Sequence, residues 1–420
     1  MILVIGAGLA GLTCAKHLTE AGQQVLVLEA TEQIGGRVRT DRYEGYWLDR
    51  GFQVLFTAYP AAQHDLDYDA LDLCRFAPEV LMTTGRKRYL LADPTRKPEH
   101  LLADLSNPLV SIGDKWKVIQ LRQELVNRSL TEIFSGQEQD ESTEQYLTRL
   151  GFAERGFIEH FARPFFGGIF LDRSLTTSAR LFQFLFKMLA CGDTVIPAQG
   201  MQRIPEQLAA RLPVGAIRCR TRVRELLMHE QRVHAVLLDS GEKIEADQVV
   251  VATESPEAAR LTGCSLPTEG VGSTCLYFAG DEPLYREPAL VVSASTQASI
   301  NHVVLLSNIA PTYAPAGKHL LSVAVLGNME GDDERLARSC LTELEEWFPE
   351  HDLSRWKFLA AYRIPFSQFA QRPGIFDQLP GNRTHIEGLY LAGEYTESSS
   401  IQGAMESGMC AARAVVEMLR

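Results

Sequence analysis

The first 30 positions of the chain combine short apolar runs with a segment of helical spacing. The runs Ile2–Ile5 and Val25–Leu28 are apolar at every position, which predicts two strands buried on both faces. Residues 12–18 between them have helical spacing, and Gly22 ends the helix. A strand, a helix and a strand in this order favour a parallel pair joined by a right-handed crossover.

The pattern of apolar and polar positions changes along the rest of the chain. Residues 100–190 have a mainly helical pattern, whereas apolar and polar positions alternate from residue 214 onward. This alternation predicts a β-meander, with Val249–Val251 as another buried strand. The pattern also predicts a helix at Leu336–Phe348, a strand at Leu389–Leu391 and a final helix at Gln402–Leu419.

The segment GAGLAG at residues 6–11 follows the first strand and opens the first helix, which is the pattern GxGxxG. Gly6 permits a tight turn, Gly8 lets the backbone approach a pyrophosphate, and Gly11 lets the helix pack close to the strand. The helix N-terminus offers free N–H groups to phosphates. Glu29, at the end of the second strand, can accept both ribose hydroxyl hydrogens and would repel a 2′-phosphate. These residues predict a dinucleotide site, and NAD and FAD fit them equally well.

A second glycine-rich segment distinguishes between the two cofactors. Gly35 and Gly36 let another loop approach the pyrophosphate, and Arg37 supplies charge and hydrogen bonds to it. The segment GYWLDRG at residues 45–51 follows. An NAD-dependent dehydrogenase does not need this second clamp, so the pattern favours FAD.

Taken together, GxGxxG, Glu29, GGR and G-x3-D-x-G resemble the FAD fingerprint of the superfamily of amine oxidases, phytoene desaturases and protoporphyrinogen oxidases. Two later parts resemble the same family: residues 200–205 with 221–223, and residues 392–394 with 403–408. The resemblance implies that the backbone of Val223 contacts adenine. It also implies that the backbone at Gly393 and Glu394 reaches the ribityl–phosphate linkage, although the family usually has Asp in place of Glu394.

The C-terminal motif has a physical rationale, because reduced flavin carries negative charge at N1 and O2. A helix N-terminus near Gln402 and the N–H of Met405 would stabilise that charge. No Cys or His stands in a recognisable attachment motif, so we expect non-covalent FAD. The residues expected to bind FAD are Gly6, Gly8, Leu9, Ala10, Gly11, Glu29, Ala30, Gly35, Gly36, Arg37, Gly51, Phe52, Gln53, Val223, Gly393, Glu394, Gly403, Ala404 and Met405.

The resemblance implies an α/β fold in two parts. One is a Rossmann-like FAD-binding domain, a parallel sheet with a β-meander, and the other is a discontinuous α+β substrate domain. Because the nucleotide motifs must converge on one cofactor, the FAD-binding domain is expected to take residues 1–75, 195–268 and 356–420. The substrate domain then takes residues 76–194 and 269–355.

Two differences from the amine oxidases of this superfamily argue against amine oxidation. Amine oxidases place an aromatic residue beside the C-terminal motif, but residues 398–401 are SSSI. They also tend to have a flavin-facing lysine on a substrate-domain strand, and the corresponding residues 274–279 contain none. Residues 157–186 are rich in phenylalanine, and Phe157, Phe161 and Phe165 share one helix face. This face is either plain core or the wall of a tunnel for an apolar substrate.

The expected activity is that of an FAD-dependent oxidoreductase: a desaturase or dehydrogenase of an apolar, isoprenoid- or carotenoid-like substrate, with hydride transfer to flavin. The candidate catalytic residues are Gln53 and Arg363. Their structural alternatives are a plain hydrogen bond for Gln53 and a surface or phosphate-facing arginine for Arg363. The alternative functions are a flavin amine oxidase, a redox-neutral flavin-dependent isomerase and a non-catalytic flavin-binding scaffold.

Composition narrows the partners and the compartment. The 420 residues carry a net charge of −12, which argues against nucleic acid as the main partner. We expect a cytoplasmic protein without a transmembrane helix, and an apolar substrate adds the hypothesis of a peripheral membrane contact. The eight cysteines and ten histidines are scattered, which predicts reduced thiols and gives no metal-site signal. The sequence leaves the oligomeric state open.

Overall fold

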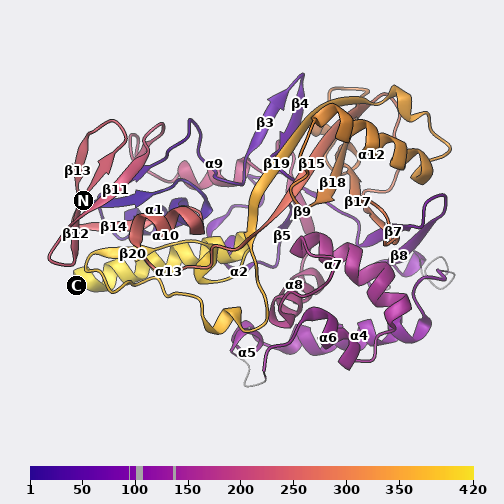
Figure 1. Cartoon of the computed structure of the whole chain (residues 1–420), viewed down its shortest axis with the longest axis horizontal. Helices are drawn as coiled ribbons and strands as arrows, with labels where there is room; N and C mark the ends of the chain where they lie inside the picture. Colours follow the sequence, from indigo (N-terminus) through magenta and orange to yellow (C-terminus); the bar gives the residue numbers. More distant parts are fainter. Residues whose placement is uncertain (94, 101–106, 136–138) are drawn as a thin grey trace.

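A five-stranded parallel sheet forms the part of the molecule that holds both termini (Figure 1). The computed structural model of the chain describes residues 1–93, 95–100, 107–135 and 139–420. Residues 101–106 and 136–138, which belong to the part expected to be helical, lie outside the described residues. The sheet has the order β10-β2-β1-β14-β20, and its strands are β10 (Ile217–Arg218), β2 (Val25–Leu28), β1 (Ile2–Ile5), β14 (Gln248–Val251) and β20 (Leu389–Leu391).

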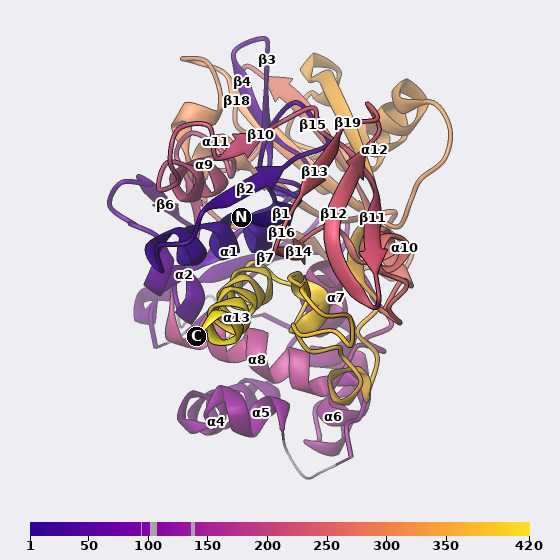
Figure 2. The same ribbon diagram turned by 90° about the vertical axis from the view of Figure 1, so that its left-hand side faces the viewer.

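The first and last long helices of this part lie side by side, as Figure 2 shows for α1 (Leu9–Glu20) and α13 (Ile401–Leu419). Their close contact depends on Gly408, because a Cβ added there would lie 2.4 Å from the carbonyl oxygen of Ala10. The N-terminal glycine motif and the C-terminal motif are thereby held together.

A three-stranded antiparallel sheet packs beside the parallel sheet, with α10 (Ser255–Thr262) against its first strand. Its strands are β11 (Val223–His229), β12 (Arg232–Leu238) and β13 (Lys243–Glu245). The next buried strand along the chain, Val249–Val251, is not part of this meander. It lies in β14, which pairs in parallel with β1, and all four residues of β14 are buried because the sheet is covered on both faces.

A seven-stranded mixed sheet forms a second centre of the molecule. Its order is β19-β15-β18-β17-β16-β7-β8, and its strands are β19 (Lys357–Phe369), β15 (Gly270–Gly280), β18 (His319–Leu326), β17 (Ile300–Leu305), β16 (Leu290–Ser293), β7 (Glu79–Thr83) and β8 (Arg88–Ala92). The helix α12 (Asp333–Trp347) packs on it. This helix begins three residues before the expected Leu336, because the Asp332 side chain caps its first N–H groups.

One boundary of the expected domain division differs from the strand pairing. Residues 357–369, which the sequence places with the FAD-binding segments, form β19 and pair with β15 along almost its whole length. The strand therefore belongs to the seven-stranded sheet, and the chain returns to the parallel sheet only after Phe369.

Helices fill the side of the molecule below the seven-stranded sheet (Figure 1). They are α4 (Ile112–Asn127), α5 (Leu130–Phe134), α6 (Thr143–Arg149), a π-helical segment (Glu154–Ala162), α7 (Arg163–Phe170) and α8 (Ala179–Cys191). The phenylalanine-rich stretch is not one straight α-helix, because it starts in the π-helical segment, α7 ends before Leu171, which has a φ of +58°, and α8 starts only at Ala179.

Short elements connect the two large sheets. Strands β5 (Leu55–Phe56) and β6 (Leu73–Arg75) flank β9 (Thr194–Pro197), and β3 (Thr40–Tyr43) pairs with β4 (Tyr46–Asp49). The remaining helical elements are α2 (Pro60–Asp65), α9 (Arg203–Ala209), α11 (Leu306–Ile309) and single turns at Pro98–His100, Pro311–Tyr313, Leu353–Arg355, Ile375–Asp377 and Glu394–Thr396.

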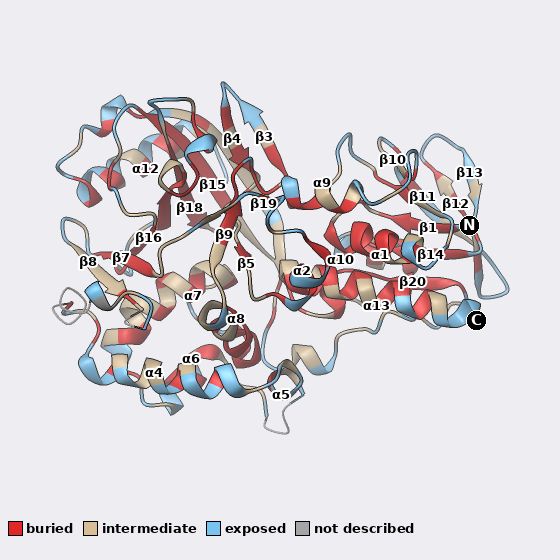
Figure 3. Ribbon diagram, turned by 180° about the vertical axis from the view of Figure 1, so that it is seen from behind, coloured by how far each residue is buried: buried red, intermediate tan, exposed pale blue. Residues whose placement is uncertain are grey.

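Burial follows this architecture, as Figure 3 shows: the central strands of both large sheets are buried, whereas the edge strands β19 and β8 are mostly intermediate. Many exposed positions lie on the outer helices and loops. On α4, three large apolar side chains remain exposed, Ile112 at 68%, Trp116 at 61% and Val126 at 38%. None of the helices in the described ranges has the length and hydropathy that a membrane span requires.

Candidate active site

A cavity of about 1050 Å³ is lined at one end by the parallel sheet and at the other by the helices. Gly8, Glu29 and Val223 lie at the first end, and Val118 and Arg122 of α4 lie at the second. Of the residues expected to bind FAD, all but Gly11, Gly403 and Met405 line this cavity. The structure thus brings together motifs that lie far apart in the sequence.

The three glycines of the first turn play different structural roles. Gly6 has a φ of +107°, and a Cβ added to it would lie 2.7 Å from the carbonyl oxygen of Ala252. A Cβ on Gly11 would lie 2.0 Å from the carbonyl oxygen of Gly6, so only glycine lets α1 approach the turn. A Cβ on Gly8 would meet no protein atom within 4 Å, which leaves room for a ligand at the helix N-terminus.

The carboxylate of Glu29 is buried and oriented by two backbone N–H groups. It accepts hydrogen bonds from Ala7 at 2.9 Å and from Thr31 at 2.8 Å. A carboxylate has about four acceptor positions, so two remain for a ligand on the cavity side. The ribose contact expected for Glu29 is compatible with this geometry and stays a prediction.

Arg37 lies in a group of opposite charges on the cavity wall. Its guanidinium is 2.7 Å from the Glu394 carboxylate and 3.6 Å from that of Glu254, and it donates to the carbonyl oxygen of Ser367 at 2.6 Å. Burial acts to lower the pKa of Arg37, but the two carboxylates outweigh this effect and raise it. Burial also raises the pKa of Glu254, although Arg37 opposes the rise. The expected contact of Arg37 with a pyrophosphate stays a prediction.

The side-chain amide nitrogen of Gln53 is hydrogen-bonded, whereas its amide oxygen has no partner among the described residues. Its Nε2 donates to the carbonyl oxygens of Arg37 at 2.8 Å and Arg50 at 3.2 Å. Because those oxygens can only accept, the orientation of the amide is fixed. Its Oε1 is buried without a hydrogen-bond partner among the described residues. Gln53 therefore makes the structural hydrogen bonds of the alternative interpretation and also presents an acceptor beside the cavity.

The C-terminal motif contributes the first turn of α13. Ala404 lines the cavity, whereas Gly403 donates its N–H to the capping Ser400 hydroxyl at 2.9 Å. Met405 is fully buried and is the fifth residue of the helix, where the N–H bonds to the preceding turn. The N–H groups available to a ligand are therefore those of Ile401 and Gln402, rather than that of Met405.

The phenylalanine-rich stretch serves both as core and as cavity wall. Phe157 and Phe166 are almost fully buried, and both also line the cavity. Phe161 and Phe165 are partly exposed there, and their rings stack with centroids 5.1 Å apart. The stretch therefore acts as hydrophobic core and as cavity wall at the same time, with Phe161 and Phe165 as its more exposed rings.

Arg363, the second catalytic candidate, lines the cavity from β19 but uses its guanidinium elsewhere. It donates to the carbonyl oxygens of Met329 and Gly331 and pairs with the Asp333 carboxylate at the start of α12. These contacts hold the side chain on that loop, so the geometry does not support a catalytic role.

Among the buried polar residues that line the cavity, the sequence interpretation missed His302. His302, on β17, is 6% exposed and lines the cavity, and its ring packs edge-on against Phe52 with centroids 5.0 Å apart. The surrounding run INHVVL does not distinguish this histidine as a site residue, because apart from Asn301 and His302 the run has the apolar pattern of a buried strand.

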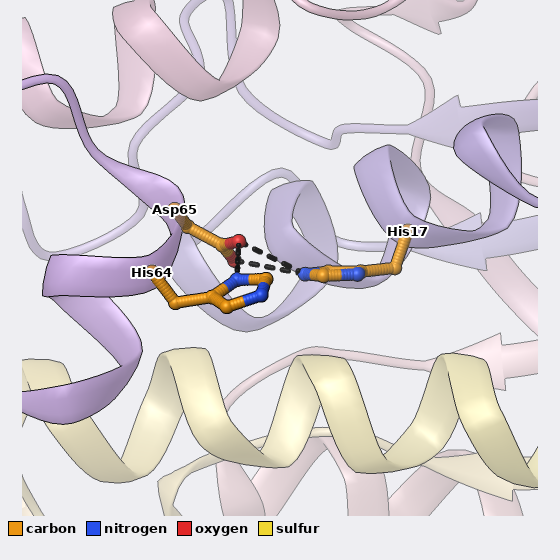
Figure 4. A group of neighbouring side chains, drawn as sticks. All are labelled: His17, His64 and Asp65. Atoms are coloured by element: carbon orange, nitrogen blue, oxygen red, sulfur yellow. Dashed lines mark hydrogen bonds and ion pairs between the residues drawn. The ribbon is translucent and has the colours of Figure 1, made fainter.

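Outside the cavity, the described residues contain a cluster that could hold a cation: His17, His64 and Asp65 (Figure 4). Both imidazoles bond to the buried Asp65 carboxylate, at 3.0 and 2.7 Å, and the Lys16 ammonium lies 3.1 Å from the same carboxylate. Burial acts to raise the pKa of Asp65, but these partners lower it to about 2. Since Lys16 already supplies the positive charge, the cluster is explained as a link between α1 and α2.

Comparisons with known proteins agree with this geometry. The chain matches 15-cis-phytoene desaturase of Glycine max at 24% identity, covering 99% of this chain and 79% of that protein. It matches 15-cis-phytoene desaturase of Synechococcus elongatus at 22% identity, covering 99% and 95%.

Among solved structures, a putative protoporphyrinogen oxidase from Exiguobacterium sp. has a TM-score of 0.75 at 21% identity, covering 100% of this chain and 99% of that one. Putrescine oxidase bound to putrescine has a TM-score of 0.72 at 18% identity, covering 99% and 98%. At such identities the structures show the fold alone. The family model described as flavin containing amine oxidoreductase matches residues 9–416. The chain therefore belongs to the flavin-containing amine oxidoreductase family and is an FAD-dependent oxidoreductase.

Proposed function

We propose that the protein is a desaturase or dehydrogenase of a large apolar substrate of the isoprenoid or carotenoid type. The observation that carries the proposal is that one cavity is lined both by the dinucleotide motifs and by the rings of Phe161 and Phe165. The two phytoene desaturases that match over 99% of the chain support the same substrate class.

The residues of the first end fit FAD. Gly8 leaves space at the N-terminus of α1, Glu29 keeps free acceptor positions, and the buried Gln53 Oε1 lacks a protein partner among the described residues. These three, with Arg37 and Ala404, would hold the cofactor. When bound, FAD supplies the hydride acceptor for oxidation of a C–H bond.

The chain's own contribution at the second end is orientation and exclusion of water. The stacked rings of Phe161 and Phe165 offer flat apolar surfaces to an extended hydrocarbon. Each buried CH₂ contributes about 0.8 kcal/mol, so a long chain binds tightly without a charged anchor. The conjugated or allylic carbon next to the departing hydride needs only to be held in place, which contact with these ring faces would do.

We also propose that the substrate enters beside α4 from a bilayer surface. Lys115, Val118 and Arg122 of α4 line the cavity, and Ile112 and Trp116 are the two most exposed apolar residues of the same helix. Spaced four apart, these two side chains lie on one helix face and can insert into the headgroup region. The net charge of −12 favours hydrophobic docking on zwitterionic lipid over attraction to anionic lipid.

The proposed domain division follows from the cofactor. Residues 1–75 and 195–268, with the residues after β19, would form the FAD-binding domain, and the remainder would form the substrate domain. The strand orders of the two large sheets support this division, with the boundary moved from 356 to 369.

Anaerobic flavin reduction tests the proposed activity. The holoenzyme is mixed with phytoene or squalene in detergent, and separately with polyamines and monoamines, while flavin absorbance is followed. Bleaching by an isoprenoid is the expected result, and reoxidation by oxygen against a quinone then identifies the electron acceptor. Bleaching by an amine alone would favour an amine oxidase. Turnover only after prior reduction, without net oxidation of substrate, would favour a redox-neutral isomerase.

A further inference from the structure

His302 lines the cavity, and one nitrogen of its imidazole has no hydrogen-bond partner among the described residues. Its Nε2 is buried and makes no hydrogen bond to any described residue. Buried polar atoms nearly always have a partner, so an orphaned atom on a residue that lines a cavity points to a ligand contact. The neighbouring Phe52 ring offers no strong acceptor to this nitrogen.

The hydrogen bonds of Asn301 determine which imidazole nitrogen carries the proton. The Asn301 Nδ2 lies 3.0 Å from the carbonyl oxygen of Pro164 and 3.0 Å from the Nδ1 of His302. The Pro164 oxygen can only accept, so the amide nitrogen must face it. The second hydrogen of the same amide nitrogen points to His302 Nδ1, which is then an acceptor. A neutral imidazole whose Nδ1 accepts carries its proton on Nε2.

His302 is therefore a fixed, neutral hydrogen-bond donor rather than a base. Burial lowers its pKa to about 4, so it is uncharged at neutral pH. Its Nδ1 edge is held against α7, because a Cβ added to Gly168 would lie 2.6 Å from Asn301 Nδ2 and 3.3 Å from His302 Nδ1.

We propose that the Nε2–H of His302 donates a hydrogen bond to an oxygen of the substrate, a carbonyl, ether or hydroxyl oxygen. The substrate is then an oxygenated isoprenoid, apolar along its length and with one acceptor near Phe52, rather than a pure hydrocarbon. This inference rests on the proposed function and narrows its substrate class. An acceptor at this point would satisfy the unpaired Nε2–H of His302, whereas a hydrocarbon would leave this donor unpaired in the complex.

A matched pair of ligands tests the inference on the FAD-loaded enzyme. Farnesylacetone and the hydrocarbon of the same carbon skeleton are titrated anaerobically, and binding is followed by perturbation of the flavin spectrum. We expect the wild type to bind the ketone roughly 10-fold more tightly, and His302→Phe to abolish this preference. His302→Gln, which retains an N–H donor, should restore part of it. His319→Phe, on the adjacent strand β18 and not among the residues that line the cavity, should leave it unchanged.

An infrared measurement on the wild type keeps the inference testable if the phenylalanine variant does not fold. The carbonyl stretch of bound farnesylacetone should lie below its value in hexane, as it does in a hydrogen bond. Equal affinity for both ligands, or an unshifted carbonyl, would refute the inference alone. A second outcome would also refute the inference: the ligand-free His302→Phe variant has a changed flavin spectrum but keeps the preference for the ketone. The Nε2–H would then donate to FAD rather than to the substrate. Failure of the wild type to bind either ligand would refute the proposed function itself.

Discussion

The guanidinium of Arg37 lies 2.7 Å from the carboxylate of Glu394, so the loop after β2 is joined to the turn after β20. Glu254, after β14, adds a second carboxylate at 3.6 Å. The Arg37 side chain thus links three loops that follow strands of the parallel sheet. All three loops lie at the carboxyl end of the sheet, and ligands bind at this end in open α/β sheets. The charge balance is incomplete without Arg37, because two carboxylates would then face each other across the cavity wall.

Arg37→Ala is therefore expected to weaken FAD binding about 10- to 150-fold, the equivalent of roughly 1.5–3 kcal/mol for a lost charge-assisted contact. The apoprotein should also unfold at a lower temperature, because Glu394 loses its cation. Titration of the apoprotein with FAD measures the affinity. Arg224→Ala, an exposed change on β11, serves as the control. Unchanged FAD affinity in Arg37→Ala would show that the pyrophosphate lies elsewhere.

Glu29 has two functions that substitution can separate. Glu29→Gln keeps an acceptor for the N–H of Ala7 or Thr31 but loses the charge, whereas Glu29→Ala loses both. We expect FAD affinity to fall about 10-fold or more in Glu29→Ala and less in Glu29→Gln. Equilibrium dialysis of FAD against both variants gives the order. Equal and wild-type affinity in the two would contradict the ribose contact.

The flavin should be bound without a covalent link. Precipitation of the holoenzyme with acid is expected to release all of the flavin into the supernatant, where absorbance quantifies it. Yellow colour retained in the washed pellet would contradict this expectation. A colourless protein that FAD cannot reconstitute would contradict the cofactor site as a whole.

Gly408→Ala tests the contact between α1 and α13. The added methyl group would overlap the carbonyl oxygen of Ala10, so the two helices must separate, at a cost of roughly 1–3 kcal/mol. Since α1 carries the glycine motif, FAD retention should fall together with stability. Gly113→Ala in α4 is the matched control, because its nearest neighbour is 3.7 Å away and helix propensity would stabilise it by up to about 1 kcal/mol. Urea unfolding curves of both variants decide the comparison.

The Asp49 carboxyl should make stability depend on pH. Burial raises its pKa from 3.8 to about 6, although hydrogen bonds from Thr40, Met201 and Tyr313 oppose the rise. The folded protein then binds a proton more tightly than the unfolded chain, so this stabilisation is complete below about pH 4 and is lost as pH rises through 6.

Asp49→Asn removes the titration. Relative to wild type, its free energy of unfolding should improve by about 1–2 kcal/mol between pH 5 and pH 8. Urea unfolding at the two pH values gives this difference, and Asp239→Asn, an exposed change, should show none. The same difference from wild type at both pH values would mean that Asp49 is ionised in the folded protein throughout this range.

Local sequence predicted the parts of the site that depend on local backbone geometry. Gly6 has a φ of +107°, and Gly11 is required by a contact within its own turn, so their spacing alone reveals them. His302 could not be found in this way, because its significance comes from Asn301 and from the carbonyl of Pro164 on another element. The assignment of β19 failed for a similar reason, since pairing with β15 is a property of two segments rather than of one.

The order of strands in the parallel sheet has a consequence for biosynthesis. β1 and β2 are translated first, but β14 and β20, and the helix α13 that packs on α1, lie far later in the chain. At about 5–20 residues per second, roughly 20–70 s separate the emergence of β2 from that of β20. During this interval the apolar surface of α1 lacks its partner, and the nascent chain cannot form the complete cofactor pocket. FAD can therefore act as a ligand that selects finished molecules, because a chain interrupted before residues 389–419 would lack both the last strand and the helix that close the site.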